Sequence, residues 1–165
     1  MIIDSITKKY NMSLLKSRDT NSKPANKEKM RILMFHAPSF WFKTYKKVVE
    51  DVPDLNEDRS VKNALVVFYH AEENDVVNRS GVLTKLIKNI KWLSGKCGTK
   101  NLLLHSFKHL STSKAPPEFT RELVVEASAR LTGSGFTVTE TPFGYLNEWK
   151  IHVAGESLAK VFKEF

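Results

Sequence analysis

Hydrophobic residues occur along the chain in short runs separated by polar turns, and the spacing within each run predicts its secondary structure. Unbroken apolar runs of the kind found in buried strands lie at 31–36, 62–71 and 101–105. The run at 62–71 is the strongest, because four of its ten residues are β-branched or aromatic. Three further segments have weaker strand patterns: 40–50, 136–139 and 146–153.

Apolar residues recur at helical spacing in three other segments: 78–93, 116–131 and 156–165. In the first, Ser80 is predicted as the N-cap, and Gly95 with Gly98 ends the helix. In the last, four apolar side chains are expected to be buried: Leu158, Val161, Phe162 and Phe165. Because strands and helices alternate, the sequence predicts an α/β (α+β) domain with a mixed β-sheet.

The remaining segments are predicted to be turns and loops. Residues 37–39 contain Pro38 and are expected to break the first strand, and residues 51–60 form an acidic loop. Residues 106–113 form a polar loop after the strand at 101–105. Residues 142–145 form a turn, because they contain both a proline and a glycine.

Length and composition restrict the class of protein. A chain of 165 residues with 41% hydrophobic residues and ten Phe supports one folded domain. A single cysteine excludes a disulfide framework. No apolar run is long enough to cross a bilayer, and the first residues lack the apolar core of a secretory signal. We therefore expect a soluble cytoplasmic protein that makes no contact with a membrane.

Positive charge is in excess, with 26 Lys and Arg against 18 Asp and Glu, so a polyanionic partner is plausible on charge alone. Residues 1–29 hold seven basic and three acidic residues and little that could be buried. They are predicted to form a basic, flexible N-terminal arm, which is either an electrostatic tether for RNA or an inert extension. A stripe of Lys85, Lys88 and Lys91 either faces phosphates or is the solvated face of a helix.

Familiar catalytic motifs are missing from the sequence. The five histidines show no metal-binding spacing, and neither a phosphate-binding Walker loop nor a GxSxG motif is present. We therefore predict neither a metal nor a cofactor. Two loops stand out: 105–111 combines backbone amides with a lysine and imidazoles, and 142–145 has a glycine, flanked by aromatic residues, where backbone can approach a ligand. They indicate a small polar pocket built partly from main chain, and they leave its ligand open.

Several motifs in a fixed order resemble the archaeal threonyl-tRNA synthetase editing domain. They are a Phe-x-His-Leu-Ser loop at 107–111, a Gly-Phe pair at 135–136, a Pro-Phe-Gly-Tyr turn at 142–145 and a Trp-Lys-Ile strand at 149–151. The segment 30–36 is similar to that family's Met-Arg-hydrophobic-His first strand, and 65–68 to its second apolar run. The resemblance covers 30–165, which we expect to be the editing domain.

This resemblance implies a fold like that of D-aminoacyl-tRNA deacylases, a homodimer, and an activity. The activity is hydrolysis of the ester that links serine, attached by mistake, to tRNA(Thr). Serine lacks one methyl group of threonine, a difference that a synthetic pocket converts into only about 1–3 kcal/mol. A second pocket with rigid main-chain walls supplies the remaining discrimination. In the family the attacking water is activated largely by the terminal hydroxyl of the tRNA.

The resemblance also assigns roles to residues. His109 would lie near the terminal ribose, with Lys108 and Asn147 as the other catalytic candidates. The residues expected to contact substrate are His36, Ala71, Ser106, Phe143, Gly144 and Tyr145.

The sequence departs from the family pattern at important positions. Leu146 and Asn147 replace a tyrosine and a lysine, and Lys160 stands where a glutamate occurs in the last helix. Ser106 replaces a proline. Asn147 can still donate a hydrogen bond but lacks the positive charge of lysine. Lys108 replaces a small residue, so we hypothesise that it restores this charge from across the pocket.

Three interpretations therefore remain open. The first is an editing enzyme that acts on Ser-tRNA(Thr), and the second is a tRNA-binding module of a threonyl-tRNA synthetase system that has lost catalysis. The third is a D-aminoacyl-tRNA deacylase. Because 165 residues cannot hold a synthetase core, the sequence predicts an excised domain or a freestanding protein that works beside a separate threonyl-tRNA synthetase.

Overall fold

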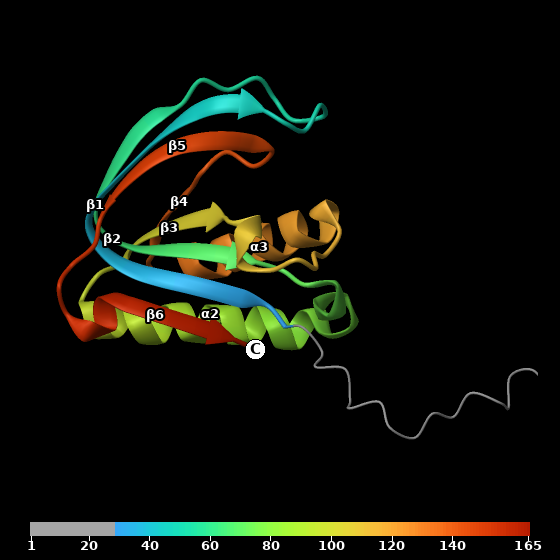
Figure 1. Ribbon diagram of the computed structural model, residues 1–165. Coiled ribbons are helices and arrows are strands. Elements are labelled where there is room, and N and C mark those ends of the chain that lie inside the picture. The colour runs from blue at the N-terminus through green and yellow to red at the C-terminus, as the bar shows by residue number, and fades with distance from the viewer. Residues whose placement is uncertain (1–28) are drawn as a thin grey trace, which may run out of the picture.

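The structure, a computed structural model, describes residues 29–165, and within them it forms one six-stranded sheet with two long helices (Figure 1). The predicted N-terminal arm, apart from residue 29, lies outside the described residues. The strands are β1 (Arg31–Lys47), β2 (Asp58–His70), β3 (Asn101–Ser106), β4 (Thr137–Glu140), β5 (Tyr145–His152) and β6 (Lys160–Glu164). The α-helices are α2 (Arg79–Cys97) and α3 (Pro117–Thr132), and the short 3-10 helices are η1 (Glu73–Asn78), η2 (Lys108–Leu110) and η3 (Ser157–Ala159).

The sheet is mixed, which confirms the predicted fold class. Its strands follow the order β4-β3-β2-β1-β5, and β6 also pairs with β1. β1 is antiparallel to β2, β5 and β6, whereas β2, β3 and β4 are parallel to one another. Parallel neighbours need a long crossover connection, and α2 and α3 provide the two crossovers here.

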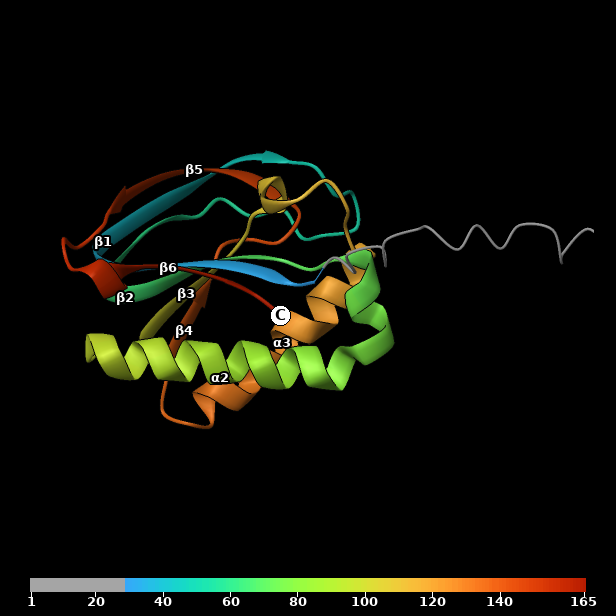
Figure 2. The same cartoon turned by 60° about the horizontal axis from the view of Figure 1, so that its bottom comes forward.

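Both helices lie on one side of the sheet (Figure 2), and the two faces of the sheet carry different cores. Against the helices, the core is mainly aliphatic and includes Leu86 and Ile90 of α2 and Leu123 of α3. The opposite face is aromatic and centres on Phe40, Phe42 and Phe68. β2 lies between the two cores, which explains why its sequence is continuously apolar rather than alternating.

β1 is one strand of 17 residues, so the prediction that residues 37–39 break it was wrong. Pro38 has no N–H to donate, and it lies where the outer partner of β1 changes from β6 to β5. On the inner side it faces Asn63, whose φ of 44° is unusual for a residue other than glycine. The strand bends at this point instead of ending, and its second half curls over the first with β5 (Figure 1).

The C-terminal segment is a strand, so the helix predicted for 156–165 was also wrong. After the single turn η3, β6 pairs antiparallel with the first half of β1, from Arg31 opposite Glu164 to Phe35 opposite Lys160. Val161 and Phe165 pack on the helix-side core, whereas Phe162 points away and is 53% exposed. Ten residues give too short a helix to persist without packing, whereas pairing with β1 satisfies the backbone of 160–164.

The other predicted elements are confirmed with shifted ends. The helix predicted at 78–93 continues to Cys97, its N-cap is Asn78 rather than Ser80, and only Gly98, in the left-handed conformation with φ 66°, ends it. Asn78 Oδ1 accepts a hydrogen bond from the Gly81 N–H at 3.2 Å. The acidic loop predicted at 51–60 ends earlier, since β2 already begins at Asp58.

The placement of β6 can be tested with a matched pair of substitutions. Val161→Asp puts a carboxylate against the core and should lower the free energy of unfolding by about 2 kcal/mol or more. Phe162→Asp changes an exposed position and should cost less than about 1 kcal/mol. Urea titration of both variants measures the difference. Equal losses would contradict the strand, because a helix with the predicted apolar face would bury both side chains.

Candidate functional site

The segment that follows β3 is held firmly against the end of β2. The Phe107 N–H donates to the Tyr69 carbonyl at 2.9 Å, and the Ala115 N–H donates to the Ala71 carbonyl at 2.9 Å. Between these two bonds, the His70 ring nitrogen lies 2.6 Å from the Ser113 carbonyl. Residues 107–115 therefore form a fixed strap, which contains η2 and the predicted catalytic candidates Lys108 and His109.

Arg31, the second residue of the family-like first strand, anchors the middle of this strap. Its Nη1 donates to the Leu110 carbonyl at 3.0 Å, directly after His109. The same guanidinium lies 3.3 Å from the fully buried carboxylate of Glu72 and 2.9 Å from that of Glu164 in β6. A planar, five-donor group is suited to such simultaneous contacts. Arg31 thus ties the start of β1, the end of β6 and the strap together.

The start of β1 is fixed by a second buried carboxylate, that of Asp75 in η1. Its two oxygens accept the backbone N–H groups of Met30 at 3.1 Å and of Glu72 at 2.8 Å. Burial raises the pKa of Asp75, and these two hydrogen bonds act in the opposite direction. The bond to Met30 holds the backbone directly before Arg31, whose guanidinium reaches the strap.

An aromatic cluster connects the strap to β5 across the sheet. Phe68 of β2 lies at its centre, with ring centroids 5.1 Å from Phe107 and 5.3 Å from Trp149. The His109 ring packs edge-on against Phe107 at 5.3 Å and is exposed to solvent. Rigid aromatic side chains therefore form a continuous wall between His109 and the strand that carries Asn147.

The Pro-Phe-Gly-Tyr bend is held by the loop between β1 and β2. The Gly144 carbonyl accepts the backbone N–H groups of Val48 and Val49, and a Cβ at Gly144 would lie 3.0 Å from the side chain of Val49. Gly144 has φ 81°, so glycine is required there for both conformation and space. The close approach that this glycine permits is made by the chain's own valine side chains.

Tyr145 strengthens the same connection. Its hydroxyl donates to the Pro53 carbonyl and accepts the Leu55 N–H, both at 2.9 Å. Both hydrogen-bonding functions of the phenol thus bind the loop. Tyr145 was expected to contact substrate; in the structure its hydroxyl holds one wall of the cavity described next.

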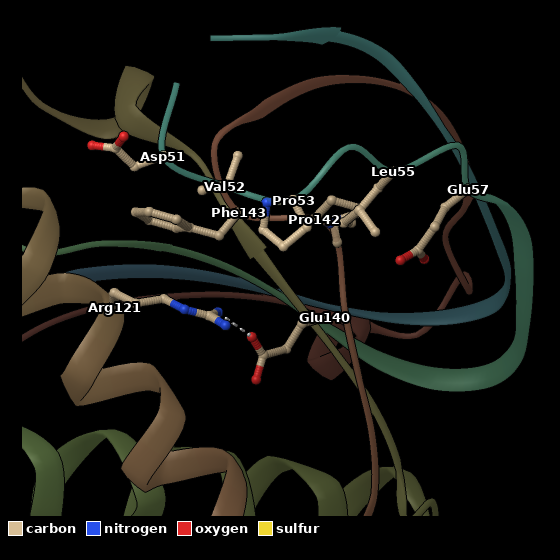
Figure 3. A pocket seen from close by; sticks show the side chains of 10 residues that line it. Asp51, Val52, Pro53, Leu55, Glu57, Arg121, Glu140, Pro142 and Phe143 are labelled. Carbon is tan, nitrogen blue, oxygen red and sulfur yellow. Dashed lines mark hydrogen bonds and ion pairs between the residues drawn. The ribbon is translucent and has the colours of Figure 1, made fainter. Parts of the chain in front are cut away.

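A cavity of about 430 Å³ lies where this loop meets the bend and α3 (Figure 3). Arg121 of α3 forms an ion pair with Glu140 at 3.2 Å and lies 5.5 Å from the Phe143 ring centroid. The described residues that line the cavity are Asp51, Val52, Pro53, Leu55, Glu57, Arg121, Glu140, Thr141, Pro142 and Phe143. It has apolar walls, one guanidinium and several carboxylates, a composition that suits a small ligand with both an apolar and a charged part.

His109 is not among the described residues that line this cavity, although Phe143 is. The two regions are connected through His105, whose Nδ1 lies 2.9 Å from the Thr141 hydroxyl on the cavity wall. The ring of His105 in turn contacts Phe107, the neighbour of His109. A single pocket that holds both His109 and the bend, as expected from the sequence, therefore stays a prediction.

Asn147 lies on the inner, concave side of β5, opposite Thr44 of β1. Its Nδ2 donates to the Tyr145 carbonyl at 3.2 Å, whereas its Oδ1 is buried and accepts no hydrogen bond from the described residues. Thr44 is itself bound to the backbone of Glu57, a cavity-lining residue. A buried acceptor without a donor costs free energy, so this oxygen is suited to a water molecule or a ligand donor.

The other predicted site residues occupy different environments. Ser106 and Lys108 are exposed at the carboxyl end of β3, beside His109. Ala71 is buried, and its carbonyl already accepts the strap. His36 lies in the middle of β1. Its cross-strand partner Leu65 in β2 is paired with Leu102 of β3, which is four residues before Ser106. His36 and Ser106 are therefore about 13 Å apart along the strand direction. The structure does not bring His36 to the strap.

Lys160, expected in a last helix, begins β6, and its Nζ donates to the Ala154 carbonyl at 3.2 Å. Sequence reasoning did not single out Arg31, Phe68 or Glu57 for the site. Phe68 and Trp149 are ordinary core residues by pattern, and Arg31 was noted only as part of a motif. No local signal shows that an arginine in one strand will reach a loop 79 residues away.

His105 is buried at the carboxyl end of β3, beside the aromatic cluster. Burial lowers the pKa of this imidazole to about 4, so the ring is neutral at pH 7. A neutral ring has one donor and one acceptor nitrogen, which allows a stable bond with the Thr141 hydroxyl. His105 therefore acts as a fixed link between the aromatic cluster and the cavity rather than as a group that titrates near neutrality.

Among the described residues, no group of three or more His, Cys, Asp or Glu side chains is placed to hold a metal ion. No helix among residues 29–165 is long and apolar enough to cross a membrane.

Comparison with known proteins gives a consistent result. The sequence model of one family, described as the archaea-specific editing domain of threonyl-tRNA synthetase, matches residues 30–165. Among curated proteins, the chain is 30% identical over 142 residues to a threonine–tRNA ligase of Hyperthermus butylicus. It is 27% identical over 135 residues to that of Thermococcus onnurineus. The matches cover 82% and 80% of this chain but only 23% and 22% of the relatives, so the chain spans less than a quarter of their length.

Among solved structures, the c-Myc DNA unwinding element binding protein superposes with a TM-score of 0.57 at 9% sequence identity. The match covers 82% of this chain and 98% of that one. At this identity the likeness shows the fold alone, which is the D-aminoacyl-tRNA deacylase-like fold implied by the sequence motifs.

The state of His105 gives a prediction with a defined sign. The unfolded imidazole, with an ordinary pKa of 6.5, binds a proton more readily than the folded one, so acid favours unfolding. Stability from this group is complete above pH 6.5 and is lost as the pH falls towards 4. Between pH 7 and pH 5 the loss should be about 2 kcal/mol.

Urea unfolding of His105→Asn should show this part of the pH dependence removed, whereas His152→Asn, at an exposed position of β5, should behave like the unsubstituted protein. An unchanged pH dependence in His105→Asn would contradict the buried, neutral state.

Proposed function

The chain belongs to the archaea-specific family of threonyl-tRNA synthetase editing domains, and on this premise we propose that it hydrolyses the ester between L-serine and tRNA(Thr). Such a reaction corrects an error that binding alone cannot prevent, because one methyl group gives a synthetic site only about 1–3 kcal/mol of discrimination. An editing site discriminates in the opposite direction: it accepts the smaller amino acid and excludes the larger one by its shape.

The observation that carries this proposal is the rigid junction of the strap 107–115, β2 and β5 through one aromatic wall. The strap is fixed by backbone hydrogen bonds at both ends and by Arg31 in the middle. Walls made from hydrogen-bonded main chain cannot move aside for an extra methyl group as a flexible side chain can. Such stiffness favours discrimination between serine and threonine by size.

In the proposed reaction, the terminal adenosine of the tRNA lies over the strap, with its ribose near the exposed imidazole of His109. The free hydroxyl of that ribose lies beside the ester and orients the attacking water, so no strong protein base is required. Water attacks the ester carbonyl, the bond to the ribose oxygen breaks, and serine and tRNA with a free terminal hydroxyl are released. Backbone N–H groups are suited to stabilise the oxyanion that forms.

Two side chains are proposed to act where the family has one lysine, with different chemistry. Asn147 Oδ1, buried and without a donor, accepts a hydrogen bond from the attacking water or from the substrate ammonium. Lys108, exposed on η2 beside His109, supplies the positive charge. A homodimer and a separate threonyl-tRNA synthetase that provides the mischarged substrate complete the proposal.

One observation favours a second candidate, a tRNA-binding module without catalysis. Lys160, the first residue of β6, donates to the Ala154 carbonyl. The lysine that stands in place of the family's glutamate is therefore already bound to nearby backbone. If that glutamate is needed for chemistry, binding of tRNA would remain and hydrolysis would not.

The proposed activity is tested by following amino acid release from three substrates: Ser-tRNA(Thr), Thr-tRNA(Thr) and a D-aminoacyl-tRNA. We expect serine to be released at least about tenfold faster than threonine, because the excluded methyl group is worth that factor or more. Binding of tRNA without release would establish the non-catalytic module instead. Faster release of the D-amino acid would establish a D-aminoacyl-tRNA deacylase.

The role of Lys108 has its own test. Lys108→Ala should reduce kcat/KM for Ser-tRNA(Thr) by about tenfold or more, the usual effect of removing a charge that stabilises a transition state. Lys114→Ala, which removes an equally exposed lysine from the other end of the strap, should change it less than about twofold. Deacylation at the unsubstituted rate in Lys108→Ala would dispose of the idea that this lysine compensates for Asn147.

A further inference from the structure

The outer face of α2 carries only positive charge. The helix spans 19 residues and contains five basic residues and no acidic one: Arg79, Lys85, Lys88, Lys91 and Lys96. Its inner face, with Leu86, Ile90 and Leu93, is buried against the sheet. A surface helix that needs only a solvated face commonly mixes both signs of charge, which gives stabilising pairs one turn apart. α2 contains no acidic residue and therefore no such pair along its whole length.

The lysines of this face are not neutralised. Among the ion pairs of residues 29–165, the one that involves α2 joins Arg79 to Glu126 at 2.7 Å. Lys85, Lys88 and Lys96 are exposed and have no ion pair among the described residues. Lys91 donates to the neutral Ser134 hydroxyl at 2.8 Å and keeps its charge.

Trp92 stands in the middle of these lysines. Lys88 and Lys96, four residues before and after it, are its neighbours on the helix surface. Lys85 lies two turns before it on the same side of the helix. From β6, which runs beside α2 (Figure 1), the Lys163 ammonium lies 5.2 Å from the Trp92 ring centroid. The indole is 41% exposed. We call Lys85, Lys88, Trp92, Lys96 and Lys163 the α2 basic face.

We propose that the α2 basic face binds the phosphate backbone of RNA, with Trp92 as a stacking or sugar-packing group. Unpaired lysines around an exposed aromatic ring are the combination that binds nucleic acid without reading its sequence. The proposal rests on the proposed function in one respect: tRNA is the RNA expected at this surface. It adds a second contact, because α2 and the aromatic wall with His109 lie on opposite faces of the sheet.

This separation fixes which part of the RNA is bound. The aromatic wall receives the terminal nucleotide, and a face beyond the sheet can reach only the body of the molecule. The edge formed by β6 connects the two sides, since β6 contributes Lys163 to the basic face and pairs with β1. A second copy of this chain is a poorer occupant, because a two-fold contact through this face would bring lysine against lysine.

The test is equilibrium binding of an uncharged tRNA(Thr) transcript to the full chain at a series of KCl concentrations. The triple variant Lys85→Gln, Lys88→Gln and Lys96→Gln should bind at least about tenfold more weakly at 0.1 M salt. The slope of log K against log[salt] should become shallower by about 2, because each lost phosphate contact removes about 0.7–0.9 from it.

The matched control removes the same charge elsewhere: Lys43→Gln, Lys46→Gln and Lys150→Gln, on the exposed surfaces of β1 and β5. We expect it to keep most of the affinity and the slope. Equal losses in the two triple variants would overturn the proposal, because they would show a response to net charge alone. Unchanged binding in the α2 triple variant would overturn it as well and would leave an acidic protein surface as the occupant.

Trp92 provides an independent readout. Trp92→Phe keeps an aromatic ring and should retain binding within about threefold, whereas Trp92→Ala should lose about fivefold or more, as expected for one stacked base. The fluorescence change on adding tRNA should shrink in Trp92→Phe relative to the unsubstituted protein. An identical change would place Trp92 outside the interface and contradict its role.

Failure of this proposal and failure of the editing reaction are distinguishable. Serine release from a short aminoacylated CCA trinucleotide depends on the editing site alone, so the α2 triple variant should hydrolyse it at the unsubstituted rate. The same variant should show a raised KM and an unchanged kcat for full-length Ser-tRNA(Thr). If no substrate is hydrolysed, the binding measurements still decide the role of the α2 basic face.

Discussion

The arrangement of the molecule depends on one long strand, β1, which pairs with three other strands and takes part in both halves of a curled sheet. Its first half pairs with β2 and β6 beneath the strap, and its second half carries β5 over the aromatic face. Because the strand bends at Pro38 without ending, β5 is brought back above β2. That return is what places Trp149 against Phe68 and sets Asn147 on the concave side.

The sequence predicted the elements with strong local patterns and missed those determined by distant partners. Local sequence is enough to predict the strands at 62–71 and 101–105 and the helices α2 and α3, because each pattern reflects which side of the element is buried. It is not enough to predict the structure at Pro38 or at residues 160–164. A proline normally interrupts a strand, and only the change of partner from β6 to β5 at this position makes it acceptable.

The same distinction applies to the site. Local sequence predicted loops at the strap and at the bend, and the structure has loops there, because glycine at a left-handed position and a polar run after a strand are local features. Motifs could not show that Gly144 and Tyr145 use their special properties to hold the loop before β2. Nor could they show that a buried, neutral His105 joins the cavity to the aromatic wall, since its environment is assembled from β2, β3 and β5.

The edges of the sheet have a further consequence for how the protein behaves in a crowded solution. One edge is β4, only four residues long, and the other is divided between β5, of eight residues, and β6, of five, which both pair with β1. β5 and β6 also carry Glu148, Lys150 and Lys160 on exposed positions. Short, bent and charged edges are poor templates for another chain, so this mixed sheet is protected against edge-to-edge aggregation by its own topology.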